Sequence, residues 1–472
     1  MVVGEFSIET ESVVIGGGPA GYLAAIRLSQ LGNEVTLVEK RRDLGGVCLN
    51  EGCIPSKSLI HAAGVYHDSV SSSEMGVVAD VEDVSLDFGR LQTWKDGVVD
   101  RLTSGVESLE DANGVDVLRG EAVFDSENEV RVVGDEGTDI IEFESCVIAT
   151  GSEPIEVPSL PTSHEGVVDA KGALELEEVP DRLAVVGGGY IGTELGTAYA
   201  KLGSEVTVIE SLDRILSNVP EDVVEPVRHR ADEIGVEIKT DARAEGIETN
   251  EDGSVTLSVS VADDEREIEA DVVLVAVGRQ PTTAGLRLEK AGVETDDDGY
   301  IHADDQMRTS NPSVFAAGDV AGEPLLAHKA YHEAKVAAEV ISGEASAAEF
   351  VVPSVIYTDP EIATVGMTQE DADDRGYDVG VGRFPFSASG RALTKARDNG
   401  FVKVVVDSET EAILGAQMVG DGVSELISEA TLAVEMGALV SDVSMTVHPH
   451  PTVSEAFREA CEDAVGESIH KP

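Results

Sequence analysis

Two stretches of the chain share one order of apolar, glycine-rich and polar positions. Residues 13–15 form a β-branched apolar run that leads into glycines, a helical stretch and a second apolar run at residues 35–39. The same order returns 171 residues later, with runs at residues 184–186 and 205–210. Each copy therefore predicts a strand, a glycine turn, a helix and a second strand.

Each copy also carries three glycines and one carboxylate at identical spacing. The two sets are Gly16, Gly18, Gly21 and Glu39, and Gly187, Gly189, Gly192 and Glu210. Such glycines let the backbone approach a pyrophosphate at a helix N-terminus, and the carboxylate accepts hydrogen bonds from ribose hydroxyls. The repeat thus predicts two bound dinucleotides. Because Glu210 repels a 2′-phosphate and no arginine cluster follows it, the second site favours NAD over NADP.

The remaining pattern completes an α/β outline with an additional domain. Residues 147–151 and 272–279 are apolar strands that end in small residues, as expected where backbone packs against a cofactor. Asp319 follows another apolar run, where it is either a turn residue or a partner for a hydroxyl-bearing chain. From residue 350 the pattern changes to antiparallel strands at 401–407 and 412–419 and an amphipathic helix at 424–436.

The predicted fold class is α/β, with two Rossmann-like dinucleotide-binding domains and a C-terminal α+β domain. The boundaries expected from the pattern are 1–152 for the first dinucleotide-binding part, 153–279 for the second domain, 280–349 for a continuation of the first, and 350–472 for the C-terminal domain.

Charge is the most unusual property of the composition. The 472 residues include 91 Asp and Glu against 33 Lys and Arg, a formal net charge of −58. The carboxylates are spread along the whole length, which argues against an acidic tail and against nucleic acid as a partner. Molar salt screens such repulsion, so we expect a halophilic cytoplasm. The sequence predicts no membrane span and no targeting peptide.

Cys48 and Cys53 are two of only four cysteines and are separated by four residues. Glycines and a proline flank them, and the spacing is close enough for a disulfide if the backbone permits. No second Cys or His pair stands at zinc-ligand spacing. The spacing alone leaves open that both are buried structural thiols. Lys57, four residues beyond Cys53, would place a cation near a thiolate or a reduced flavin, with Glu194 as a possible ion-pair partner.

A second chemical signal lies near the C-terminus, in the sequence HPHPTVSE at residues 448–455. The prolines exclude His448 and His450 from a helix and place them on a rigid turn. Glu455 begins the next helix and can fold back to orient an imidazole, which raises its basicity and fixes its tautomer. Two surface histidines on a loop are the alternative, but the presence of two dinucleotide sites and a thiol pair in the same chain favours a base for thiol chemistry.

Taken together, these motifs resemble the flavin disulfide reductase family over essentially the whole chain, and most closely the branch that oxidises dihydrolipoyl groups. The matching segments are GGGPAG at 16–21, GGVCLNEGCIPSK at 45–57, GGGYIGTELG at 187–196, AAGDV at 316–320, YTDPEIATVG at 357–366 and HPTVSE at 450–455. Of these, the CLNxGCIPSK form is the most specific. Glu51 departs from the apolar residue often found there, which we interpret as an adaptation to salt.

The resemblance implies a role for each matching position. Cys48 would be the interchange thiol and Cys53 the charge-transfer thiol of a redox disulfide, and His450 with Glu455 would be the acid–base pair, supplied by the other subunit of a homodimer. FAD would bind the first glycine turn and NAD the second. The implied cofactor residues are Gly16, Gly18, Gly21, Glu39, Lys40, Gly46, Lys57, Ala122, Thr150, Gly151, Gly187, Gly189, Tyr190, Ile191, Gly192, Glu194, Glu210, Ala276, Gly278, Asp319 and Ala327.

The resemblance also implies a partner: the lipoyl domain of a 2-oxoacid dehydrogenase or glycine cleavage complex, because no lipoyl domain precedes the fold. Glutathione, mercuric and large thioredoxin reductases are disfavoured, since the chain shows no NADP-selecting arginine pair and its tail carries only Cys461. A flavoprotein with structural thiols, acting as an NADH oxidase, a transhydrogenase or a binding component, remains the alternative from another class.

Overall fold

The computed structural model describes residues 5–71, 75–76, 84–135, 137–261 and 264–471. They form two compact units, each assembled from three segments of the chain. Unit 1 comprises Met1–Ser58, Gly89–Ile155 and Gly278–Glu349, and unit 2 comprises Leu59–Phe88, Glu156–Val277 and Phe350–Pro472. The domain boundaries expected from the sequence stay a prediction.

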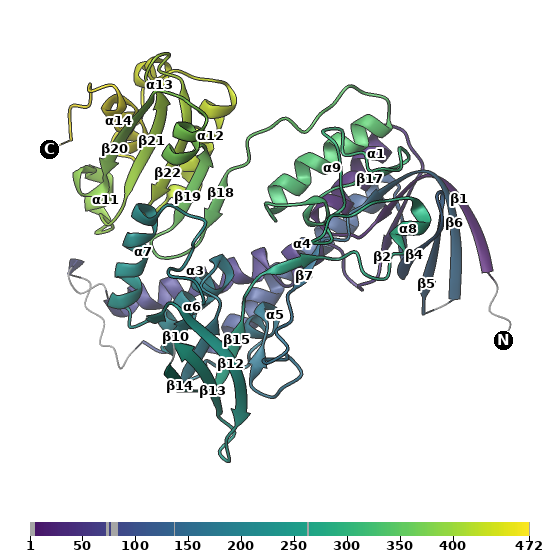
Figure 1. Ribbon diagram of the computed structural model, residues 1–472, viewed down its shortest axis with the longest axis horizontal. Helices are drawn as coiled ribbons and strands as arrows, with labels where there is room; N and C mark the ends of the chain where they lie inside the picture. Colours follow the sequence, from purple (N-terminus) through teal and green to yellow (C-terminus); the bar gives the residue numbers. More distant parts are fainter. Residues whose placement is uncertain (1–4, 72–74, 77–83, 136, 262–263, 472) are drawn as a thin grey trace. The chain divides into compact units, whose positions relative to one another are not determined.

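Unit 1 is built on a seven-stranded sheet with the order β3-β2-β1-β6-β5-β4, in which β17 also pairs with β6 (Figure 1). The parallel strands are β1 (Glu5–Ile15), β2 (Val35–Glu39), β3 (Asp116–Arg119), β6 (Gly137–Ile148) and β17 (Val314–Ala316). The antiparallel strands are β4 (Glu121–Ser126) and β5 (Glu129–Gly134). The apolar run at residues 13–15 is buried completely because its strand lies in the middle of this sheet.

Helices cover the sheet of unit 1, and α1 (Pro19–Gln30) packs along α9 (Ala327–Ile341). Leu28, Leu37 and Phe315 belong to the core beneath them. The other elements that include residues of this unit are α2 (Gly46–Asn50), α3 (Cys53–Ser71), α4 (Phe88–Asn113), β7 (Ser152–Pro154), β16 (Arg279–Pro281), α8 (Leu288–Ala291) and a 3₁₀ turn, η3 (Asp319–Ala321).

Unit 2 contains the second dinucleotide-type sheet, which is entirely parallel and has the order β11-β10-β9-β15-β8. Its strands are β8 (Val167–Val168), β9 (Arg182–Val186), β10 (Glu205–Ile209), β11 (Glu237–Lys239) and β15 (Val272–Val275), with helices α5 (Ala170–Leu174), α6 (Tyr190–Leu202) and α7 (Glu221–Glu233). A three-stranded antiparallel sheet of β12 (Ala242–Thr249), β13 (Val255–Val261) and β14 (Asp264–Ala270) shares its core.

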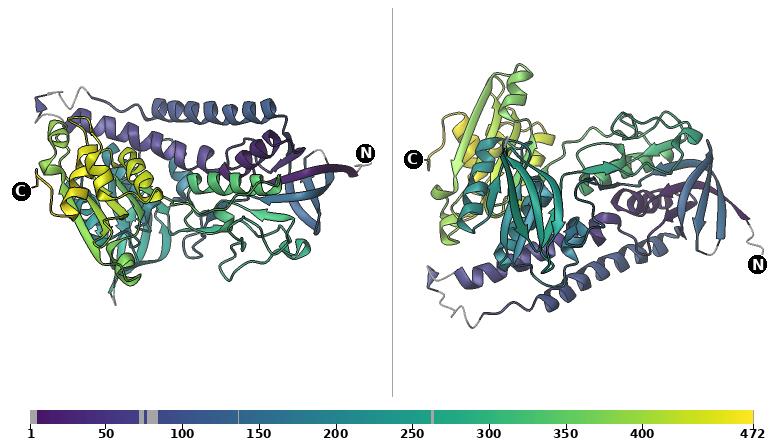
Figure 2. Two further views of the ribbon diagram at one scale, coloured as in Figure 1. Left: turned by 90° about the horizontal axis from the view of Figure 1, so that it is seen from above. Right: turned by 60° about the horizontal axis from the view of Figure 1, so that its bottom comes forward.

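The C-terminal part of unit 2 is an antiparallel sheet with the order β18-β19-β22-β21-β20. Helices α12 and α14 pack against this sheet (Figure 2). The strands are β18 (Ser354–Ile356), β19 (Ile362–Gly366), β20 (Val379–Pro385), β21 (Phe401–Asp407) and β22 (Ile413–Val419). The helices are α10 (Gln369–Asp374), η4 (Phe386–Ala388), α11 (Gly390–Thr394), α12 (Val423–Glu435), α13 (Val440–Met445) and α14 (Ser454–Ala464). The predicted fold class is confirmed.

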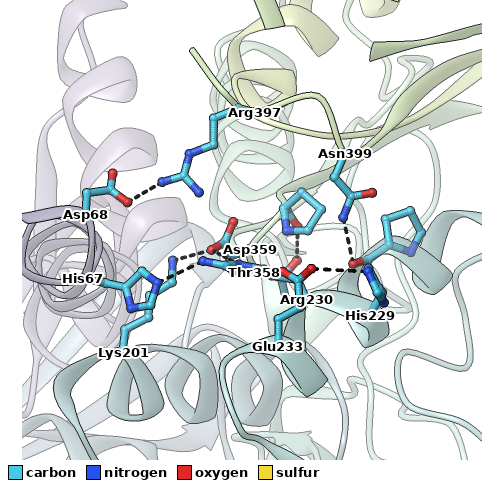
Figure 3. Close-up of polar contacts among 12 residues, drawn as sticks. His67, Asp68, Lys201, His229, Arg230, Glu233, Thr358, Asp359, Arg397 and Asn399 are labelled. Carbon is cyan, nitrogen blue, oxygen red and sulfur yellow. Dashed lines mark hydrogen bonds and ion pairs between the residues drawn. The ribbon is translucent and has the colours of Figure 1, made fainter. Parts of the chain in front are cut away.

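A polar cluster within unit 2 joins the helices of the parallel sheet to the loop between β18 and β19 (Figure 3). Asp359, in that loop, accepts from Lys201 Nζ of α6 at 2.9 Å and from Arg230 Nε of α7 at 3.2 Å through the same oxygen, Oδ2. Burial acts to raise the pKa of Asp359, but these two cations together hold it below its usual value. Arg230 also contacts His67 Nε2 at 3.0 Å, and burial followed by Arg230 and Lys201 lowers the pKa of His67.

Among the described helices, none is long and apolar enough to cross a membrane.

Helix α4 buries the carboxyl group of Glu110. Glu110 is 0% exposed, one turn after buried Val106, and neither of its carboxyl oxygens has a hydrogen-bond partner among the described residues. Burial raises its pKa to about 8 from 4.5. The folded protein thus holds this proton more tightly than the unfolded chain does, so Glu110 makes stability fall as the pH rises from about 4.5 to about 8.

We expect Glu110→Gln to stabilise the protein, and more so in alkali. The gain in unfolding free energy at pH 9 should exceed that at pH 6 by about 2–3 kcal/mol, because the ionised carboxylate is removed. Chemical unfolding at both pH values in KCl measures it. Asp111→Asn, on the exposed neighbouring position, is the control and should show no such pH dependence. An equal gain at both pH values would contradict an ionising Glu110.

Candidate functional site

The first glycine turn lies between β1 and α1 and is held by Glu39. The Oε2 atom of Glu39 accepts from Gly17 N at 2.6 Å, and Oε1 accepts from Arg41 N at 2.8 Å. A Cβ at Gly16 would lie 2.4 Å from the carbonyl oxygen of Ala149, so only glycine fits there. The carboxylate is buried at the end of β2 and braces the turn.

The second glycine turn repeats this geometry between β9 and α6. Glu210 Oε2 accepts from Gly188 N at 2.7 Å, and Oε1 accepts from Leu212 N at 2.8 Å. A Cβ at Gly187 would lie 2.4 Å from the carbonyl oxygen of Ala276, matching the first turn. The sequence repeat is therefore a structural repeat that extends to the contacts of each carboxylate.

Both helices that follow the turns begin with backbone amides that no side chain caps. The N-cap residues are Gly18 for α1 and Gly189 for α6, and neither supplies a side-chain hydrogen bond. Uncapped amides at a helix N-terminus favour an anion. A Cβ at Gly189 would meet no described atom within 4 Å, so the space above the second turn is open. These residues fit a diphosphate at each helix.

Asp319 begins the 3₁₀ turn η3 in unit 1 and lies beside Ser152. The Ser152 hydroxyl donates to Asp319 Oδ2 at 2.5 Å, and Arg279 Nε donates to the same hydroxyl at 2.8 Å. This network orients the Asp319 carboxylate, which can still accept from a further hydroxyl.

A buried ion pair on α9 forms hydrogen bonds with the backbone on both sides of that 3₁₀ turn. Lys329 Nζ lies 2.9 Å from Glu333 Oε1 and donates to the carbonyl oxygen of Gly322 at 2.8 Å. Glu333 Oε2 accepts from Gly318 N at 2.8 Å. Burial raises the pKa of Glu333, and Lys329 opposes this rise. This pair was not predicted from the sequence, although the i, i+4 spacing of Lys329 and Glu333 on an otherwise apolar helix face indicates an ion pair.

The thiols of Cys48 and Cys53 lie close enough to share a hydrogen bond. Cys48 lies on α2 and is half-buried, whereas Cys53 is exposed as the first residue of α3. The hydrogen bond that the Cys48 thiol donates to Cys53, and then burial, raise the pKa of Cys48, while the Lys57 cation lowers it. A helix N-terminus favours negative charge, which suits a thiolate at Cys53.

The thiol-bearing helix α2 is attached directly to the first glycine turn. Gly45 N donates to the carbonyl oxygen of Gly17 at 2.8 Å, and a Cβ at Gly46 would lie 2.6 Å from Gly18 Cα. Gly45 has φ +101° and Gly46 has φ +58°, a backbone that favours glycine. Cys48 therefore lies only two residues beyond Gly46, the residue that packs against the first glycine turn.

Two tyrosines near the thiols were missed by the sequence analysis. Tyr22 of α1 donates its hydroxyl proton to the Tyr331 hydroxyl of α9 at 2.9 Å. Burial raises the pKa of both phenols, and Cys48 contributes to each rise. The position of Tyr22 directly after Gly21 was the only local signal, because its partner is 309 residues away in the sequence.

His450 and Glu455 form the polar pair that the sequence predicts. His450 Nδ1 lies 3.0 Å from Glu455 Oε1, and Thr452 N donates to Glu455 Oε2 at 2.9 Å. Burial acts to raise the pKa of Glu455, but the Thr452 amide and His450 hold it below its usual value. The imidazole is 77% exposed, so Nε2 is accessible to a substrate.

The other predicted cofactor residues lie on or beside strands and helices of the two units. Thr150 and Gly151 follow β6, and Thr150 Oγ1 donates to the carbonyl oxygen of Thr282 at 2.7 Å. Lys40 is exposed after β2, Lys57 lies on α3, Ala122 is buried in β4, Tyr190 and Ile191 begin α6, Ala276 and Gly278 follow β15, and Ala327 begins α9.

Two expected associations involve residues of different units and stay predictions. Lys57 belongs to unit 1 and Glu194 to unit 2, where buried Glu194 Oε1 accepts from Tyr357 N at 2.8 Å. Likewise, the thiol pair belongs to unit 1 and the His450–Glu455 pair to unit 2.

The chain matches two family models. Residues 10–334 match the pyridine nucleotide-disulphide oxidoreductase family, and residues 352–461 match the dimerisation domain of that family.

Similar proteins cover the chain almost from end to end. A dihydrolipoyl dehydrogenase of Halobacterium salinarum is 50% identical and one of Geobacillus stearothermophilus is 48% identical, each covering 100% of this chain and 99% of the relative. Among solved structures, LpdA of Mycobacterium tuberculosis aligns with a TM-score of 0.89 at 27% identity. The HOCl-induced flavoprotein disulfide reductase RclA of Escherichia coli aligns at 0.85 and 29% identity. Both alignments cover 96% of this chain and 99% of the other.

Proposed function

The chain belongs to the pyridine nucleotide-disulphide oxidoreductase family, and from this premise we propose that it oxidises protein-bound dihydrolipoyl groups to lipoyl disulfide with NAD as electron acceptor. The observation that carries the proposal is the hydrogen-bonded thiol pair Cys48–Cys53, attached to the first glycine turn. The dihydrolipoyl dehydrogenases that match over the full chain support this substrate.

FAD and NAD are the cofactors of the proposed reaction. Glu39, Asp319 and the amides of α1 would hold FAD, and Glu210 with the amides of α6 would hold NAD. When bound, FAD accepts the electron pair from the reduced thiols and NAD carries it away as hydride. The buried Lys329–Glu333 pair keeps the turn that bears Asp319 in place.

The thiol chemistry begins from the oxidised Cys48–Cys53 pair. His450 takes the proton of one dihydrolipoyl thiol, and the resulting thiolate attacks Cys48 Sγ. A substrate–Cys48 disulfide forms as the Cys48–Cys53 bond breaks, and Cys53 leaves as a thiolate. The second substrate sulfur then attacks the substrate sulfur of this mixed disulfide, which closes the lipoyl disulfide. Cys48 leaves in this step and takes up the proton of the second substrate thiol. The substrate loses two electrons and the protein disulfide gains them.

Glu455 keeps the imidazole suited to this role. Its contact with Nδ1 holds the proton on that nitrogen, so that Nε2 can accept the thiol proton.

We propose a homodimer in which His450 of one protomer serves the thiol pair of the other. The proposed substrate is the lipoyl domain of a 2-oxoacid dehydrogenase or glycine cleavage complex, and the proposed location is the cytoplasm.

Steady-state assays of the FAD-loaded protein in molar KCl test the function. We expect rapid NAD reduction with dihydrolipoamide and at least tenfold slower reduction of NADP, because Glu210 would repel the 2′-phosphate of NADP. Glutathione disulfide with NADPH should give negligible turnover. Turnover with another disulfide but not with dihydrolipoamide would assign a different substrate. Oxidase activity alone would instead support a flavoprotein with structural thiols.

A further inference from the structure

His448 lies two residues before His450, but its side chain is buried whereas that of His450 is exposed. Its side chain is only 3% exposed. Its Nδ1 atom lies 2.9 Å from the carbonyl oxygen of Thr446, and its Nε2 atom lies 2.7 Å from Glu429 Oε1 on α12. Both ring nitrogens are therefore occupied by contacts within unit 2.

The two acceptors determine where the protons of His448 are. A carbonyl oxygen only accepts, so Nδ1 carries a proton. The 2.7 Å contact between Nε2 and a carboxylate oxygen also contains one proton, whichever atom holds it. His448 thus has no free nitrogen for substrate, and it cannot serve as a second base.

Its position makes it an anchor for the segment between α13 and α14, residues 446–453. From α14, Glu455 binds this segment through His450 and the Thr452 amide. From α12, Glu429 binds it through His448. Within the segment, Thr452 Oγ1 donates to the carbonyl oxygen of Pro449 at 2.7 Å. The segment is thereby held by two helices, while the His450 imidazole itself stays largely exposed.

We propose that His448, bound by Glu429, is a positioning residue that fixes the 446–453 segment and thereby directs His450 at the substrate thiol. The inference rests on the proposed function for its kinetic consequence and on the geometry above for the anchor itself. A base displaced by about 1 Å can lose about 10²-fold in rate. The anchor should therefore affect kcat more than substrate binding.

The kinetic test compares the loss of the contact with its conservative replacement. His448→Leu should lower kcat for dihydrolipoamide about 10–100-fold with KM changed less than about threefold. His448→Gln keeps an N–H that reaches Glu429 and should recover most of that loss. Glu429→Leu should resemble His448→Leu, and the double variant should be no worse than either single one, because both remove one interaction.

Two controls separate positioning from general damage. His470→Leu removes a similar contact, in which His470 Nδ1 lies 2.6 Å from Glu459 Oε1 on α14, and should leave kcat unchanged. Reduction of an artificial dye by NADH, which needs no thiol base, should stay unchanged in every variant. A parallel fall of dye reduction and kcat in His448→Leu, with no recovery in His448→Gln, would overturn the proposal.

Amide hydrogen exchange tests, independently of any substrate, whether His448 fixes the 446–453 segment. The Thr452 amide, which donates to Glu455, should exchange at least tenfold faster in His448→Leu than in the parent protein. Unchanged exchange would overturn the anchor even if kcat fell. Should the parent protein fail to oxidise dihydrolipoamide, the proposed function fails, and the exchange result alone then decides whether His448 holds the segment.

Discussion

Replacing Cys48 by Ser should abolish dihydrolipoamide oxidation, with a loss of at least about 10⁴-fold in kcat. A serine hydroxyl cannot form the disulfide with the substrate through which both exchange steps pass. Reduction of an artificial dye by NADH should stay within about twofold, because it requires only the bound cofactors. Stopped-flow mixing of the FAD-loaded variant with dihydrolipoamide measures the loss directly.

Cys53→Ser should be equally inactive, because the leaving thiolate of the first exchange is missing. Cys461→Ala is the control thiol variant: Cys461 lies buried in the core of the C-terminal sheet, and burial raises its pKa well above the usual range. It should keep full turnover. Turnover by Cys48→Ser close to that of the parent protein would reject the disulfide mechanism and favour a flavoprotein with structural thiols.

Asp359→Asn should destabilise the protein by about 3 kcal/mol, because it removes the anion of the buried Lys201 cation and one of the two carboxylates that contact Arg230, the other being Glu233. Lys201 Nζ and Arg230 Nε share one oxygen of this carboxylate, and the side chains of both are at least four-fifths buried (Figure 3). The lowered pKa of Asp359 means that its stabilising effect is present above its usual pKa of 3.8 and disappears as the pH falls through the folded value. Chemical unfolding of the variant at neutral pH in KCl measures the change.

Asp68→Asn provides the matched control within the same cluster. Asp68 pairs with Arg397, but its side chain is 51% exposed, so the pair should contribute less than about 1 kcal/mol. Equal losses from both variants would show that burial does not distinguish the two pairs. If the unfolding free energy of Asp359→Asn equals that of the parent protein, other partners compensate Lys201 and Arg230 for the loss of Asp359.

The sequence predicted those helices, strands, turns and contacts that depend on residues close to one another in the chain. The glycine turns and their carboxylates follow from fixed spacing within one strand–turn–helix unit, and both carboxylates bind their turns. The antiparallel strand expected at 401–407 is β21 (Phe401–Asp407), and the helix expected at 424–436 is α12 (Val423–Glu435). Glu455 begins a helix and contacts His450 across five residues.

Contacts between distant segments could not be predicted, because spacing carries no information about them. Ser152 meets Asp319 across 167 residues. Asp359 unites Lys201 and Arg230 from two helices. The helix around Glu110 is polar along most of its length, so its pattern did not reveal that this carboxyl faces the core. The sequence assigned no role to His448, and only the contacts of its two nitrogens reveal that it is bound within unit 2.

The way in which Glu39 and Glu210 brace the glycine turns has a consequence for the binding of dinucleotides at high salt concentration. Lysine and arginine are scarce in this chain, and their attraction for phosphate weakens as ions accumulate. Each turn instead offers peptide N–H groups aligned by a helix and kept in shape by an internal carboxylate. Hydrogen bonds from such fixed donors depend on direction and contact more than on long-range charge. We therefore expect this strongly acidic protein to bind anionic dinucleotides at high salt concentration mainly through peptide N–H groups.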